Sequence, residues 1–361
     1  MSFLRGLGTF VCSFLLFLAL GIFSMAFMLH STVLSANFVH KEVNQISISS
    51  IARDVADKQI ADELPTAAEP VKNAALDVIA MQEPWIKAQL NSAIDICYNY
   101  FQGKTSTLYI DIPLADIKAS LSTDLWNALQ NNLKQELAGK SESEISQYLQ
   151  GFIIQIPTDI LPPELMALPA NLRDIAIEEY LREWTGQKTL VGVPPELTAQ
   201  VEGQVKVYFD EYIAQFTKDI ADNEIIDANK IGPDGMNGIN TARRIIDDFQ
   251  TGYPWLIVFM VVMAGLIFVI NLDVKKTTRT LGIDVLVFGI LDLAGSIVAM
   301  VITPSHFIPQ TADIPVSVQH VIDNVTRDVA TVALKFSIGV LVVGAVLLVA
   351  SFFVPSRESP E

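Results

Sequence analysis

Four apolar blocks, each close to the length that crosses a lipid bilayer, restrict the folds open to this 361-residue chain. They run from Leu7 to Leu29, Trp255 to Ile270, Leu281 to Ile302 and Phe336 to Val354. A helix spans the hydrocarbon core with about 17–25 apolar residues. The sequence therefore predicts a membrane protein that is mainly α-helical, with four transmembrane helices.

The first block is predicted to be an uncleaved anchor, residues 1–36, and not a signal peptide. Its apolar core is longer than the roughly 7–15 residues of a signal-peptide core. The stretch "STVLSANF" that follows it offers a poor cleavage site. The anchor therefore stays attached to the rest of the chain.

Basic residues predict the orientation, because Lys and Arg gather in cytoplasmic loops. They occur before the first block, between the second and third blocks, and after the fourth, as Arg5, Lys275, Lys276, Arg279 and Arg357. Both termini are thus predicted to be cytoplasmic, in the cell membrane. The predicted parts are an extracytoplasmic domain at 37–250, a three-helix transmembrane region at 251–354 with an outer loop at 303–331, and a cytoplasmic tail at 355–361.

The segment 37–250 is predicted to be α-rich with minor β structure. Apolar periodicity predicts helices over 35–64, over 71–81 and from Pro84 to Gly103. Three stretches read as short strands that end in Ile-Pro or Val-Pro, at 106–114, 151–157 and 188–194. A turn-rich loop, "NKIGPDGMNG" at 229–238, is expected before the second membrane block.

Charge and cysteine content limit the function classes. The segment 37–250 holds 32 Asp and Glu but 17 Lys and Arg, an acidic balance that argues against nucleic-acid binding and suits a solvated surface. Cys12 lies in the first block, so Cys97 has no partner for an internal disulfide. This domain must be held by its hydrophobic core, and we expect a bacterial or archaeal membrane.

Catalytic and metal-binding motifs are missing from the sequence, which contains no HExxH, CxxC, GxSxG, GxGxxG or P-loop pattern. We therefore expect no enzyme activity, no cofactor and no metal centre. Residues 227–238 resemble a calcium loop, but Ile231 and Gly238 occupy ligand positions, which excludes an EF-hand. A solvated turn is expected there, with a looser cation site at Asp227 and Asp234 left open.

One carboxylate, Asp292, lies inside the third block. At 100° per residue it shares a helix face with small residues, namely Gly289, Gly295, Ser296 and Ala299. The fourth block carries small residues at every seventh position: Ala330, Ser337, Gly344 and Ser351. Small residues let membrane helices approach closely. The two faces are therefore predicted to pack together, with Asp292 directed at protein.

Three roles for Asp292 follow from this position. It is a neutral group hydrogen-bonded to a serine or a carbonyl, a group that handles protons or ions, or the partner of a cation on another subunit, since intramembrane acids are functional candidates by default. Lys335 lies near the outer end of the fourth block, where it is expected to extend toward water.

The sequence favours a non-enzymatic binding, scaffold or sensor protein that acts through its extracytoplasmic domain. Its expected partners are the lipid bilayer and a protein bound by the acidic domain or the membrane helices. A component of a transport system that uses Asp292 is the alternative, and a lipid-processing enzyme is a third. Adjacent opposite charges, Arg243 and Arg244 before Asp247 and Asp248, are expected to form ion pairs along one helix.

Overall fold

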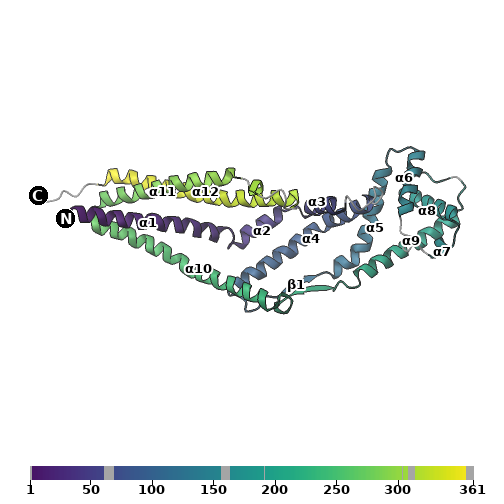
Figure 1. The fold of residues 1–361 in the computed structure, drawn as a ribbon, viewed down its shortest axis with the longest axis horizontal. Coiled ribbons are helices and arrows are strands. Elements are labelled where there is room, and N and C mark those ends of the chain that lie inside the picture. The colour runs from purple at the N-terminus through teal and green to yellow at the C-terminus, as the bar shows by residue number, and fades with distance from the viewer. Residues whose placement is uncertain are drawn as a thin grey trace. The chain divides into compact units, whose positions relative to one another are not determined.

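The computed structural model describes residues 2–60, 69–155, 163–190, 192–302, 304–307 and 314–354. Over these residues the chain is mainly helical, as the sequence predicts (Figure 1). It divides into two compact units. The membrane unit comprises Met1–Ile46, Leu90–Tyr109 and Asp227–Glu361, and the second unit comprises Ser47–Gln89 and Ile110–Ile226. The boundaries between these units differ from residues 37 and 250, which the sequence suggested as the ends of the extracytoplasmic domain.

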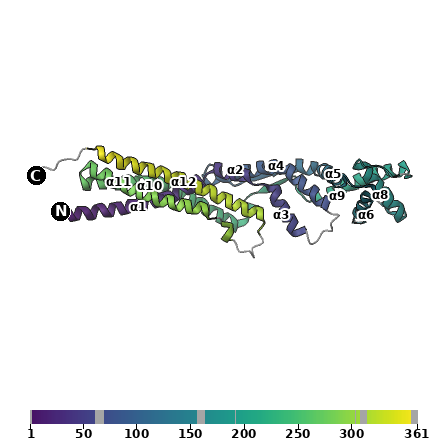
Figure 2. The same ribbon diagram turned by 90° about the horizontal axis from the view of Figure 1, so that it is seen from above.

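Within the described ranges, four helices of the membrane unit are long and apolar enough to cross a bilayer. They are α1 (Ser2–Ser31), α10 (Ala228–Asn271), α11 (Val274–Val301) and α12 (Val316–Phe353). They run in alternating directions, so the start of α1, the α10–α11 turn and the end of α12 lie at one end of the bundle (Figure 1). Helix α1 packs on α10, and α11 packs on α12 (Figure 2). The four predicted spans are confirmed as helices, while the tail 355–361 lies outside the described residues.

Aspartates begin two of these helices. The Asp227 carboxylate accepts hydrogen bonds from two backbone N–H groups of the first turn of α10, at 2.9 and 3.0 Å, and Asp273 caps α11 in the same way. Such a cap satisfies N–H groups that have no partner within the helix. The loop predicted at 229–238 is therefore wrong, because these residues lie in α10. The helix is interrupted there at Gly232, whose φ of 77° suits glycine.

The helix predicted over 35–64 is two helices, α2 (Ala36–Gln45) and α3 (Ile48–Ile60). The second begins after Ser47, whose hydroxyl accepts from the backbone N–H of Ser50 at 3.2 Å, and it receives a further cap from elsewhere in the chain. Ser49 donates its backbone N–H and its hydroxyl to Glu83 at 3.2 and 2.8 Å. The break thus has a local cap at Ser47, whereas the second capping group, the carboxylate of Glu83, is 34 residues away. Residues 61–64 lie outside the described part of the chain.

Pro84 does not separate two helices, as the sequence suggested, but lies inside α4 (Glu69–Phe101). Proline removes one backbone hydrogen bond from a helix. Before it, Ala74 and Val78 are buried against Leu125 and Ala128 of α5 (Ala115–Leu137). This packing holds the turn preceding the proline, and the helix continues to Phe101.

The second unit is built around leucine-rich helices. Besides α5 they are α6 (Glu142–Gln155), α7 (Pro163–Met166), α8 (Ala170–Trp184) and α9 (Pro195–Thr217). Their core is apolar and contains Leu133, Leu137, Leu149, Leu165, Ile177, Tyr180 and Val201. Burial of apolar side chains away from water is the main stabilising term in folding.

A two-stranded antiparallel sheet also belongs to the second unit. Strand β1 (Ile110–Pro113) pairs with β2 (Asn223–Ile226), with Ile110 opposite Ile226. Strand β1 overlaps the stretch predicted at 106–114. The strand predicted at 151–157 is wrong over 151–155, which form the end of α6, and 188–190 form no strand. A short apolar run does not by itself distinguish a strand from a buried helix turn; residues 156, 157 and 191 lie outside the description.

Candidate functional site

Asp292 on α11 is hydrogen-bonded to two other membrane helices. Its Oδ1 accepts from the Ser24 hydroxyl of α1 at 3.0 Å, and its Oδ2 accepts from the Ser337 hydroxyl of α12 at 2.6 Å. Both carboxylate oxygens thus have a donor. The arrangement joins three helices through one side chain.

Ser296, one turn after Asp292, completes this arrangement. Its hydroxyl donates to the backbone oxygen of Asp292 at 2.9 Å and lies 3.2 Å from the hydroxyl of Ser337. Ser24, Ser296 and Ser337 are 3%, 5% and 0% exposed, whereas Asp292 itself is partly exposed. We call Ser24, Asp292, Ser296 and Ser337 the serine cluster.

Glycines bring α11 and α12 close together on one side of the serine cluster, toward the start of α11 and the end of α12. A Cβ at Gly289 would lie 3.0 Å from the backbone nitrogen of Leu341, and a Cβ at Gly344 would lie 2.6 Å from that of Leu286. Such distances leave no space for a side chain. Gly282, seven residues before Gly289, packs in the same way. The small residues that were singled out at Gly289, Ser296, Ser337 and Gly344 therefore lie along one helix–helix contact.

Gly295 does not lie in this contact, although the sequence placed it on the packing face. It is exposed, and nothing lies within 4 Å of the position its Cβ would take. Gly295 precedes Ser296 by one residue, which turns it about 100° around the helix. The prediction treated a broad face as one surface, whereas the contact follows the narrower line of Gly282, Gly289 and Ser296.

Two residues of this site were not found from the sequence. Ser24 is isolated in the first apolar block, and its meeting with Asp292 depends on which helices are neighbours and at what depth. Gly282 could have been found, because it extends the seven-residue spacing of Gly289 and Ser296 by one step.

The electrostatics of the site are those of an acid held by neutral donors. A carboxylate at the centre of a membrane helix costs about 2.5–3.5 kcal/mol on insertion scales. Among the described ion pairs, none joins Asp292 to a cation. Hydroxyl donors stabilise the carboxyl oxygens without adding a charge. The hydrogen bonds of the serine cluster therefore connect the helices. The carboxyl group of Asp292 is also the kind of group that an ion pathway needs.

A buried carboxyl lies on α2. Glu42 is 6% exposed, and the Nζ of its neighbour Lys41 lies 3.7 Å away and also pairs with Asp328 of α12. Burial raises the pKa of Glu42, and the nearby Asp328 raises it further. Helices α2 and α12 thus contact each other through Lys41, Glu42 and Asp328. The charge of this group depends on whether Glu42 is protonated.

The part of the chain that the structure describes contains no group of three or more His, Cys, Asp or Glu side chains placed to hold a metal ion. No protein-family model, curated protein or solved structure matches this chain. The fold and the serine cluster define a multi-pass helical membrane protein with a hydrogen-bonded acid inside its bundle.

Proposed function

We propose that this chain is a non-enzymatic, membrane-anchored binding protein. In this proposal the four membrane helices hold the second unit on the extracytoplasmic side, with both termini in the cytoplasm. The second unit then binds a protein partner. The basic residues Arg5, Lys275, Lys276 and Arg279 lie toward the end of the bundle where α1 begins and α10 turns into α11, which supports a cytoplasmic position for that end.

The observation that carries this proposal is a row of exposed apolar side chains on α9 and just after it. Tyr212, Phe216 and Ile220 follow one another at four-residue spacing, and they are 54%, 70% and 40% exposed. Residues four apart lie on one face of a helix. An apolar face that stays in contact with water is typical of a surface that binds another protein. We call Tyr212, Phe216 and Ile220 the α9 row.

The transport alternative has one observation in its favour, the intramembrane carboxylate of Asp292. Acids at this depth mark proton and ion pathways in many membrane proteins. Both of its oxygens, however, already accept hydroxyl hydrogen bonds from neighbouring helices. This arrangement supports an anchoring role more strongly than a carrier role.

A photo-crosslinking amino acid at position 216, in the full-length chain in intact cells, tests the proposal. Val207 is the matched control, because it is 52% exposed and lies nine residues from Phe216, about 180° around α9. We expect a discrete protein adduct from position 216 and none from position 207. Equal adducts from both positions, or no adduct from either, would contradict a binding role for the α9 row.

A further inference from the structure

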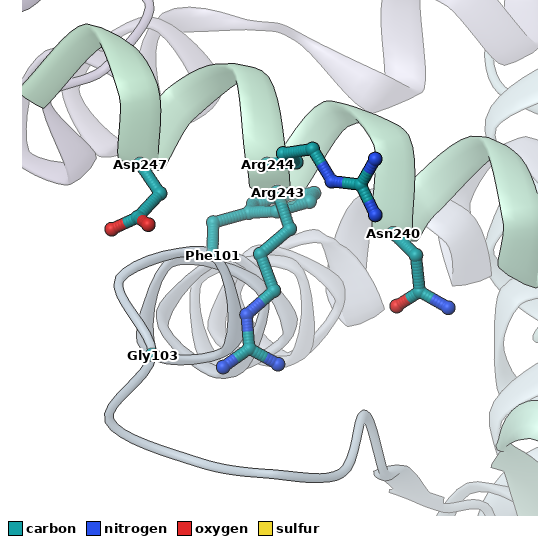
Figure 3. Close-up of a pocket in the computed structure, with 6 residues that line it drawn as sticks. All are labelled: Phe101, Gly103, Asn240, Arg243, Arg244 and Asp247. Atoms are coloured by element: carbon teal, nitrogen blue, oxygen red, sulfur yellow. The ribbon is translucent and has the colours of Figure 1, made fainter.

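A polar pocket lies in the membrane unit, where the end of α4 meets the first turns of α10. It encloses about 270 Å³. The residues that line it are Phe101, Gly103, Asn240, Arg243, Arg244 and Asp247 (Figure 3). Gly103 has a φ of 71°, which lets the chain turn beneath the arginines without a side chain.

The two arginines do not form the helical ion pairs that the sequence suggested. Arg243 places its guanidinium over the ring of Tyr100, 4.6 Å from the ring centre. Among the described ion pairs, none joins Arg243 or Arg244 to a carboxylate. Asp247 lies on the other side of Arg243 from Arg244 and Asn240 (Figure 3). Two positive charges therefore lack a paired acid, in a chain whose net charge is −16.

Asn240 adds a third donor beside the arginines. The hydroxyl of Tyr100, a residue 3% exposed, donates to the Oδ1 of Asn240 at 2.5 Å. Because the amide oxygen is occupied in this way, the NH₂ group of Asn240 is left to donate. Arg243, Arg244 and Asn240 thus border the opening with N–H donors.

We propose that this pocket binds a soluble oxyanion of the phosphate class. Guanidinium groups bind phosphate and carboxylate oxygens through paired, charge-assisted hydrogen bonds. A lipid headgroup offers the same chemistry, but Arg244 precedes Trp255, the start of the apolar block, by eleven residues, or about 16 Å of helix. The headgroup layer is only about 5–8 Å thick on each side. The pocket therefore lies beyond the headgroups, where it takes a soluble anion.

The test uses the full-length protein in a neutral detergent. Binding of inorganic phosphate is measured by calorimetry and by the shift in melting temperature, against sodium chloride at the same ionic strength. Phosphate is expected to bind and to raise the melting temperature, and chloride is not. Nanodiscs of phosphatidylcholine, with and without phosphatidylglycerol, form a second arm that reports on lipid headgroups.

Three variants separate anion binding from structure. Asn240→Asp keeps the acceptor for Tyr100 but places a carboxylate in the opening, so phosphate binding should be lost. Arg244→Gln removes a side chain that makes none of the described hydrogen bonds or ion pairs, and binding should weaken about tenfold. Arg53→Gln, an exposed arginine of α3, removes the same charge elsewhere and should change nothing.

The following results would overturn the proposal. A melting shift that chloride reproduces would show an effect of salt alone. Undiminished phosphate binding in both Asn240→Asp and Arg244→Gln would place the anion elsewhere. Binding that appears only with phosphatidylglycerol would replace the soluble anion by a lipid headgroup. If Asn240→Asp does not fold, Arg244→Gln alone decides the question.

Discussion

The two units hold a charged side chain in opposite ways. In the membrane unit, Asp292 is held by the neutral hydroxyls of Ser24 and Ser337. In the second unit, Arg182 is 1% exposed and is held by carboxylates, with Glu178 at 3.1 Å and Glu142 at 2.8 Å. A charged pair needs compensation for the water it loses, and Arg182 obtains it from a network of acceptors. Asp292 obtains hydrogen bonds without a counter-charge.

The two units also differ in how their helices pack together. The second unit buries large apolar side chains such as Leu133, Leu137 and Leu149. Removing apolar surface from water lowers the free energy of the folded state. Inside a bilayer there is no hydrophobic driving force between helices. They associate there through close backbone contact and interhelical hydrogen bonds. The glycines of α11 and α12 provide that contact. Large apolar side chains are buried in the membrane unit as well, among them Leu16, Leu20, Ile267 and Phe288, so the units differ in the glycine contact and not in having an apolar core.

The largest effect is expected for Arg182→Ala. This change leaves Glu178, which is 3% exposed, buried without its cation, and removing one partner of a buried pair costs about 3–5 kcal/mol. Chemical denaturation followed by tryptophan fluorescence reports on the second unit through Trp126 and Trp184. The control is Arg173→Ala, which breaks a more exposed pair and should cost less than about 1 kcal/mol. Equal losses would remove the distinction drawn for the second unit.

A somewhat smaller loss is expected for Gly344→Ala in the membrane unit. The new methyl group would meet the backbone of Leu286 at 2.6 Å, and overpacking of this kind costs about 1–3 kcal/mol. The matched control on the same helix is Gly339→Ala, where nothing lies within 4 Å of the added carbon. Thermal unfolding in detergent should separate the two variants. A stable Gly344→Ala protein would show that the α11–α12 contact is looser than described.

Changes at Asp292 should have a graded effect. Asp292→Asn keeps a hydrogen-bonding group for Ser24 and Ser337, so folding and oligomeric state should be nearly unchanged. Asp292→Leu leaves both hydroxyls without this acceptor and should cost about 1–2 kcal/mol of helix association. Resistance to unfolding in detergent measures both. If Leu is tolerated as well as Asn, the hydrogen bonds do not hold the bundle.

Effects of pH are expected to have opposite signs in the two units. In the second unit, the hydrogen bond from Lys87 and those from Ser49 lower the pKa of Glu83 to about 2. A lowered pKa stabilises the fold above the ordinary value of 4.5, and this contribution is lost as pH falls toward 2. In the membrane unit, the raised pKa of Glu42 means that stability is lost as pH rises through that pKa.

Melting curves of the full-length protein between pH 2 and pH 9 measure both slopes. In Glu83→Gln the loss between about pH 5 and pH 2 should shrink. In Glu42→Gln the loss at higher pH should shrink instead. Glu211→Gln, an exposed residue of α9, serves as the control and should leave both slopes in place. Curves that are unchanged in both test variants would contradict the assigned pKa directions.

The sequence predicts the membrane helices and much of their contact because both depend on local patterns. Block length reveals the spans, and the seven-residue spacing reveals Gly289, Ser296, Ser337 and Gly344. Features that depend on distant partners are not predicted, and Ser24 is one of these. The sequence does not distinguish Arg182 from an arginine on the surface, because its acceptors come together only in the folded structure. Glu83 caps a helix that begins 35 residues before it.

The central claim is that the membrane helices anchor the chain and the second unit binds the partner. The most direct measurement is crosslinking from position 216 in intact cells that carry Asp292→Asn, at equal protein level and melting temperature. If the bundle only anchors, the adduct formed from position 216 should be as abundant as in the parent chain. Loss of that adduct from a well-folded Asp292→Asn protein would show that the intramembrane carboxylate controls binding, and would contradict the account.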